Sequence, residues 1–153
     1  MDNERLRTFC LSLPHTTETL NWGHVLVYWV GDRDLGGKMF AMANAEGVGG
    51  MLLAFPAAPE DFYELLELDG IYAEPHLARA RWVALERWNA LTGRQIEEKL
   101  AAAHALTYEK LSRRAKAVLA MPKKEQARLL RERRKELAAA GKLRSSGAFG
   151  RKH

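Results

Sequence analysis

The spacing of hydrophobic positions changes along the chain, and each spacing predicts a different element. Over residues 3–13 the apolar side chains recur at intervals of three or four, which is typical of an amphipathic helix. Asp2 or Asn3 is suited to cap this helix, and Pro14 ends it. The polar segment 16–19, which follows, is expected to be an extended connector.

Three apolar runs then follow at strand-like length, rich in β-branched and aromatic residues and separated by glycine-rich turns. The predicted strands are residues 24–30, 38–43 and 51–55. The turns between them, residues 31–37 and 44–50, are short. Short connections of this kind predict an antiparallel meander.

The second half of the chain alternates helical and strand-like patterns without an internal repeat. The predicted elements are a helix at 60–68, strands at 71–73 and 81–85, a long helix from Thr92 to about Ala120, and a helix at 123–140. Gly141 is expected to end the last helix, with residues 142–153 disordered. The order α-βββ-α-ββ-α predicts an α+β fold of two layers, with helices packed on an antiparallel sheet and an added C-terminal basic helix.

Composition places the chain among ordinary globular proteins. It has 153 residues, 47% of them hydrophobic and 28% charged, which suits one domain. The single cysteine excludes an internal disulfide framework, and no apolar run approaches the roughly 18 residues of a membrane span. The acidic N-terminus lacks the apolar region of a signal peptide, so we expect a soluble, cytoplasmic protein without membrane partners.

The net charge of +5 hides an asymmetry between two parts of the chain. Residues 1–110 hold 10 basic and 16 acidic side chains, whereas residues 111–153 hold 14 basic and 3 acidic ones. We therefore divide the chain into an α+β domain at 1–120 and a basic helical extension at 121–153. The extension is either an arm for a polyanion or a solvated helix that keeps the protein soluble.

The basic extension is the strongest signal in the sequence. On a helix, Arg128, Arg131, Arg134 and Lys135 are predicted to form one basic strip. Such a strip can bind the phosphates of DNA or RNA without sequence preference, and this binding is sensitive to salt. The extension has one aromatic residue, Phe149, which argues against recognition by base stacking.

The body of the domain offers a second group of cations. Arg79 and Arg81 are two positions apart, so in an extended segment they share one face and can hold an anion, with His76 nearby. The alternative is that they pair with acids such as Glu64, Glu67 or Glu74. Lys38 follows two glycines that lack the frame of a phosphate-binding loop; we predict a hairpin turn, from which Lys38 can still face an anion.

No arrangement typical of catalysis or of metal binding is present. No two histidines have the spacing of a metal site on a helix, and Cys10 lies on the apolar face of the first predicted helix, as a buried small hydrophobe does. None of the serines lies in a nucleophile elbow. We therefore expect neither an enzyme nor a cofactor.

Several segments nevertheless resemble one known family in the order in which they occur. They are 10–14 (CLSLP), 22–23 (WG), 36–41 (GGKMFA) and 75–83 (PHLARARWV). Over residues 4–114 the chain resembles the MmcQ/YjbR family of small bacterial proteins. The resemblance implies an α+β fold, likened to secretion chaperones, to frataxin-type proteins and to a double-wing arrangement. It also implies DNA binding as a proposed function, and it brings no catalytic residues.

Three hypotheses for the function follow. The first is a non-enzymatic protein that binds DNA or RNA through the basic extension, aided by Arg79 and Arg81. The second is a protein-interaction or chaperone-like module whose sheet surface pairs with a copy of itself or with a partner; that surface contains Tyr28, Trp29, Met39 and Met51. The third is a small anionic ligand, bound at the corner formed by Arg79, Arg81 and His76.

Overall fold

The computed structural model describes residues 1–46 and 50–147; the other residues, and the side chains of 142–147, lie outside the description. The helices are α1 (Asn3–Ser12), α2 (Pro59–Leu65), α3 (Gly93–Glu109), α4 (Arg113–Leu119) and α5 (Lys123–Gly147). The strands are β1 (Thr16–Asn21), β2 (Val25–Val30), β3 (Lys38–Asn44), β4 (Leu53–Pro56), β5 (Ile71–Ala73) and β6 (Trp82–Leu85). Three short 3-10 turns are η1 (Arg33–Leu35), η2 (Ala78–Ala80) and η3 (Trp88–Ala90).

The strands form one antiparallel sheet of six strands in the order β1-β2-β3-β4-β6-β5, so β1 and β5 are its edges. The fold is therefore α+β, as predicted. The prediction for residues 16–19 was wrong, because this segment begins β1 and pairs with β2 along its whole length. Its threonines lack the apolar alternation of a buried strand because β1 is an edge strand and is only partly buried.

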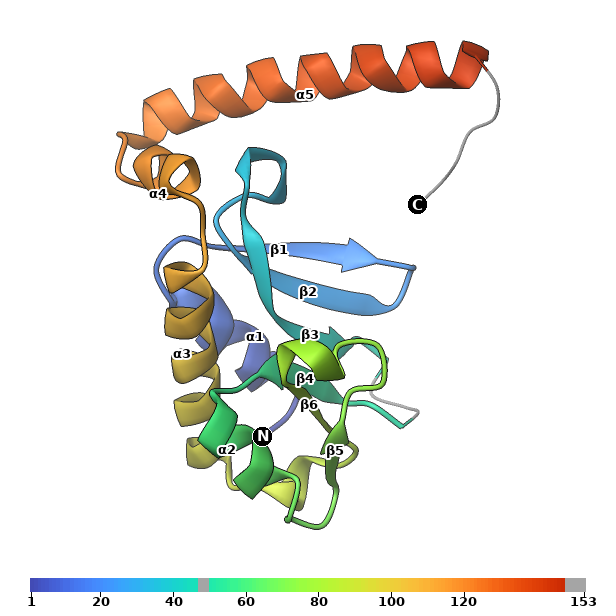
Figure 1. Ribbon diagram of the computed structural model, residues 1–153, viewed down its shortest axis with the longest axis vertical. Helices are drawn as coiled ribbons and strands as arrows, with labels where there is room; N and C mark the ends of the chain where they lie inside the picture. Colours follow the sequence, from blue (N-terminus) through green and yellow to red (C-terminus); the bar gives the residue numbers. More distant parts are fainter. Residues whose placement is uncertain (47–49, 148–153) are drawn as a thin grey trace.

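Helices α1 and α3 cover one face of the sheet, with α2 near its lower end (Figure 1). The side chains between these layers form the main core. Its largest fully buried members are Tyr28, Phe40, Phe55, Leu6, Leu53, Leu85, Ile96 and Leu100. Strand alternation brings every second residue of β2, β4 and β6 into this core.

The opposite face of the sheet carries a second, smaller apolar cluster. Val27, Met42 and Trp82 are buried there, and Trp29 and Met39 pack against them. Tyr28 does not belong to this surface, contrary to our expectation, because it alternates with Trp29 and points to the helices, where it is fully buried.

Two predicted helix boundaries were wrong. The long helix expected after Thr92 is broken at residues 110–112, where Ser112 caps α4 by accepting a hydrogen bond from the backbone N–H of Ala115 at 3.0 Å. The last helix does not end at Gly141 but continues to Gly147, because a long exposed helix tolerates one glycine. Residues 148–153, predicted to be disordered, lie outside the described residues, as does part of the predicted turn 44–50.

His104 of α3 lies at the edge of the main core and is buried. Its Nε2 lies 2.7 Å from the carbonyl oxygen of Pro14, and its ring packs edge-on against Phe40 with centroids 5.1 Å apart. Burial lowers the pKa of His104 below its ordinary value, although the bond to Pro14 partly opposes this effect. The folded protein therefore holds this imidazole neutral to a lower pH than the unfolded chain does.

Acidification is expected to destabilise the protein through His104. The unfolded chain binds a proton at this histidine near the ordinary pKa of 6.5, whereas the folded protein resists it, so stability is lost as the pH falls below that value. Urea unfolding at pH 7 and pH 5 measures the loss. A His104→Gln variant should lose less than the wild type, and a His24→Gln variant, changed at an exposed histidine, should lose as much. Equal losses in all three proteins would contradict this assignment.

Candidate functional site

Helix α5 crosses one end of the molecule and is anchored to the turn between β2 and β3 (Figure 1). Arg134 donates from Nε to Asp34 at 3.2 Å and from Nη2 to Asp32 at 3.4 Å. Asp32 also accepts the backbone N–H of Asp34 at 2.8 Å, which orients η1. These two carboxylates therefore fix the position of α5 on the domain.

The connection from α4 to α5 is held by hydrogen bonds. Gln126 donates from Nε2 to the carbonyl oxygens of Met121 at 2.8 Å and Leu119 at 3.4 Å. Leu130 lies one turn after Gln126, on the same side of α5, and is partly buried. The helix therefore has one face toward the domain and the opposite face toward solvent.

The charge of Arg128 is compensated within α5. Its guanidinium donates to Glu125 and to Glu132, the latter at 2.7 Å. The hydrogen bond from Arg128 holds the pKa of Glu125 below its usual value, so this carboxylate is ionised at neutral pH. Arg133 pairs with Glu136 in the same way, at 3.1 Å.

Three other cations of α5 share its outer face and take no part in the ion pairs of the described residues. Lys124, Arg131 and Lys135 are spaced at i, i+7 and i+11, which returns them to one side of a helix after two and three turns. All three are exposed, and we call them the α5 ridge. The ridge spans about 16 Å at 1.5 Å per residue.

The predicted basic strip is therefore divided among three roles. Arg131 and Lys135 belong to the ridge, Arg128 is neutralised by neighbouring glutamates, and Arg134 is directed to the domain as the anchor. The pairing of Arg128 with Glu125 and Glu132 depends on side-chain positions that the pattern of charges along the helix does not give. Lys124, seven positions before Arg131, is an additional member of the exposed group that the predicted strip did not include.

Lys38, Arg79 and Arg81 are all exposed, and Lys38 opens β3 directly after the turn that anchors α5. Arg79 lies in η2, and Arg81 has a left-handed backbone with φ of 59°, so the two are not consecutive same-face residues of a strand as expected. In Figure 1, η2 lies away from α5. None of the ion pairs of the described part includes these three cations, so the pairing with body acids is not seen either.

Glu74, one of the acids suggested as their partner, has a different role. Its carboxylate is buried and accepts the backbone N–H groups of His76 at 2.6 Å and Leu77 at 3.0 Å. It thereby shapes the loop that leads to η2. Trp82, which follows this loop, is buried.

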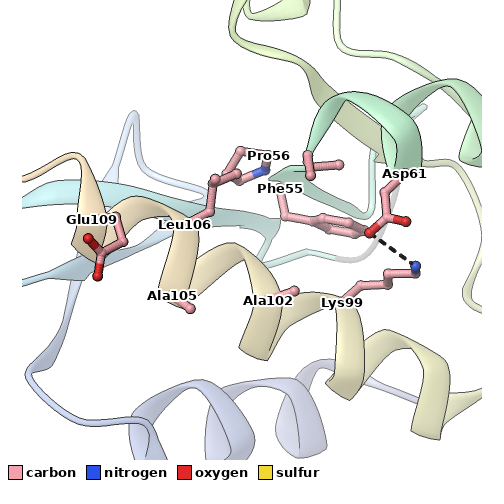
Figure 2. Close-up of a pocket in the computed structure, with 10 residues that line it drawn as sticks. Phe55, Pro56, Asp61, Lys99, Ala102, Ala105, Leu106 and Glu109 are labelled. Atoms are coloured by element: carbon pink, nitrogen blue, oxygen red, sulfur yellow. Dashed lines mark ion pairs between the residues drawn. The ribbon is translucent and has the colours of Figure 1, made fainter.

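A groove lies between β4, α2 and α3, within the helical layer (Figure 2). Its volume is about 330 Å³, and its walls are mainly apolar, with Phe55, Ala102 and Leu106 among them. Lys99 and Asp61 point toward each other at one end, 3.6 Å apart, so the cation is already paired. The groove offers space for an apolar group but no cluster of unpaired polar groups for catalysis.

The described residues contain no group of three or more His, Cys, Asp and Glu side chains that could hold a metal ion. Cys10 is fully buried, and burial raises the pKa of its thiol to about 12, so it is a poor nucleophile at neutral pH. Among the described helices, none is long and apolar enough to cross a membrane.

Comparisons with known proteins agree with the fold. A family model described as YjbR matches residues 11–106, a range that ends before α4 and α5. A solved structure, the Deinococcus radiodurans protein DR2400 with the family-model domain DUF419, aligns with a TM-score of 0.67 at 25% identity. The alignment covers 79% of this chain and 89% of that one. No curated protein gives a significant match.

Proposed function

The chain belongs to the YjbR family, and from this premise we propose that it is a non-enzymatic protein that binds the phosphate backbone of DNA or RNA through the α5 ridge. The observation that carries the proposal is the exposure of Lys124, Arg131 and Lys135 on one face of α5, without acidic partners among the described residues. Cations aligned in this way repel one another unless an anion neutralises them.

A nucleic-acid backbone suits this ridge better than a small anion does. Duplex DNA presents a phosphate every 3.4 Å along each strand, so a ridge of about 16 Å can contact several phosphates at once. The ridge lacks aromatic side chains, so it has no means of stacking on bases. We therefore expect binding without sequence preference.

Two triple variants of equal charge test the proposal. The first replaces Lys124, Arg131 and Lys135 by serine, and the second replaces Lys38, Arg79 and Arg81 by serine. Because each phosphate contact contributes about 0.9 to the slope of log K against log salt, we expect the first variant to lower the slope by about 2 to 3. At about 50 mM salt its affinity should fall roughly 10- to 100-fold.

The measurement is fluorescence anisotropy of a labelled random-sequence duplex, and of a single strand, at about 50 and 200 mM salt. The second variant should bind as the wild type does. If that variant loses affinity and the ridge variant does not, the body cations bind instead and α5 is a solvated helix. Absence of binding by the wild type at low salt would end the proposal.

A second candidate function, protein interaction, is favoured by a different part of the molecule. Leu20 and Trp22 are 60% and 71% exposed at the hairpin between β1 and β2. Large apolar side chains gathered in this way often mark contact surfaces between proteins.

A further inference from the structure

The free edge of β1 presents unpaired backbone groups to solvent. The carbonyl oxygen of His15, just before β1, accepts the N–H of Gly31 at 2.7 Å, so odd-numbered residues direct their backbone groups toward β2. The even-numbered Thr16, Glu18 and Leu20 then direct theirs outward. Within the described residues no backbone hydrogen bond from outside the sheet reaches these three. The edge can therefore accept another strand.

The same hairpin carries apolar side chains that are exposed in the described part of the structure. Leu20 lies on the edge strand itself, and Trp22 lies in the turn with a left-handed φ of 54°. A bulky residue seldom adopts this conformation, and a glycine or an asparagine would adopt it more easily. A large exposed aromatic in a strained turn is a feature of a contact surface.

An open cavity of about 710 Å³ lies beside the opposite end of β1. It is bounded by the end of α1, the start of β1, η1 and the first turns of α5. Its apolar lining includes Leu11, Leu13, Leu119, Met121 and Leu130. Thr16 also lines it, so the cavity adjoins the outward edge of the strand.

We propose that β1 pairs antiparallel with β1 of a second copy about a two-fold axis at Glu18, so that the partner's Leu20 enters the cavity beside Thr16. In this register Thr16 faces the partner's Leu20, and Glu18 faces the partner's Glu18. Thr16, Glu18 and Leu20 lie on one face of β1, the face toward α1, since Glu18 pairs with Arg7 of α1. The cavity includes the end of α1, so it lies on this face as well.

A second copy is the occupant that accounts for both features. Strand β1 carries the exposed Leu20 at one end and adjoins the apolar cavity at the other end. A two-fold axis therefore brings Leu20 of each copy to the cavity of the other copy. Each bond across the edge is then made twice. The α5 ridge takes no part in this contact, so the pairing and nucleic-acid binding can fail independently.

The acidic centre of the interface is already compensated. Glu18 accepts hydrogen bonds from Arg7 Nε at 2.8 Å and from Arg7 Nη2 at 3.1 Å. Two ion pairs therefore meet at the axis, where two bare carboxylates would repel each other. Replacing Arg7 should weaken the pairing of the two copies and leave the backbone groups of β1 unchanged.

Light scattering after size exclusion, over a range of concentrations, tests the pairing on the full chain. We expect a dimeric mass for the wild type and a dissociation constant at least about 100-fold higher for Leu20→Asp, because symmetry removes the contact twice. Circular dichroism should show Leu20→Asp folded, since the side chain is exposed. Leu68→Asp, a matched change at a leucine that is 43% exposed after α2, should leave the dimer intact.

Two further variants separate this interface from others. Arg7→Ala should weaken the dimer, and Leu137→Asp on α5 should not. A monomeric wild type throughout the micromolar range would overturn the proposal. A dimer lost with Leu137→Asp and kept with Leu20→Asp would also overturn it, since the copies would then pair through α5.

Discussion

A Phe40→Ala variant is expected to lose about 4 kcal/mol of its free energy of unfolding. Phe40 is fully buried in β3, at the centre of the sheet, and its ring meets the edge of His104 with planes at 81°. Removing it deletes the largest apolar side chain of this strand and leaves a cavity against α3, which close-packed neighbours fill only in part.

Urea unfolding followed by circular dichroism at pH 7 measures this loss. A matched Leu68→Ala variant, changed at a side chain that is 43% exposed, should lose less than about 1 kcal/mol. A loss for Phe40→Ala as small as that of the control would mean that α3 moves in to fill the space.

A Gly37→Ala variant is expected to lose about 3 kcal/mol, through steric overlap. A Cβ at this position would lie 2.6 Å from the carbonyl oxygen of Gly31 and 2.8 Å from the carbonyl carbon of Asp32. These are backbone atoms of the turn, which the hydrogen bond from Gly37 N–H to Asp32 O closes at 2.8 Å, so they cannot move aside. Because Asp32 also holds Arg134, opening the turn should release α5.

Two measurements check this variant: urea unfolding, and hydrogen exchange of the amides of α5. Exchange in the first turns of α5 should become faster together with the loss of stability. The control is Gly141→Ala in α5, where a Cβ meets nothing within 4 Å, and this change should slightly stabilise the helix. An unchanged stability for Gly37→Ala would show that the turn tolerates a side chain.

Local patterns were sufficient for the elements that enter the core. The apolar runs of β2, β3 and β4 and the spacing in α1 indicated these elements directly, since burial requires such alternation. The strand β1 was not predicted because it is an edge strand. It is held by hydrogen bonds to β2 and is only partly buried, so its sequence lacks an alternation of apolar residues. The break before Ser112 has only one signal, a capping serine within an otherwise continuous apolar pattern.

The candidate site depended on contacts that no local pattern contains. Arg134 and Asp34 are 100 positions apart, so the sequence could not indicate that this arginine anchors α5. Nor could it indicate that Arg131 has no acidic partner among the described residues. Arg79 and Arg81 were assigned to one face because an extended segment was assumed. Because the backbone at Arg81 is left-handed, Arg79 and Arg81 do not lie on one face of an extended segment. An arginine side chain gives no indication of this backbone conformation.

The anchor of α5 has a consequence for any experiment in which salt is varied. Arg134 and its two aspartates are partly exposed, so dissolved ions screen this pair as they screen the ridge. Ionic strength therefore acts on the orientation of the helix as well as on its attraction to phosphate. A salt titration of the wild type alone measures the change in helix orientation and the loss of phosphate contacts together. The number of phosphate contacts follows only from the difference in salt dependence between proteins that keep the Arg134 anchor.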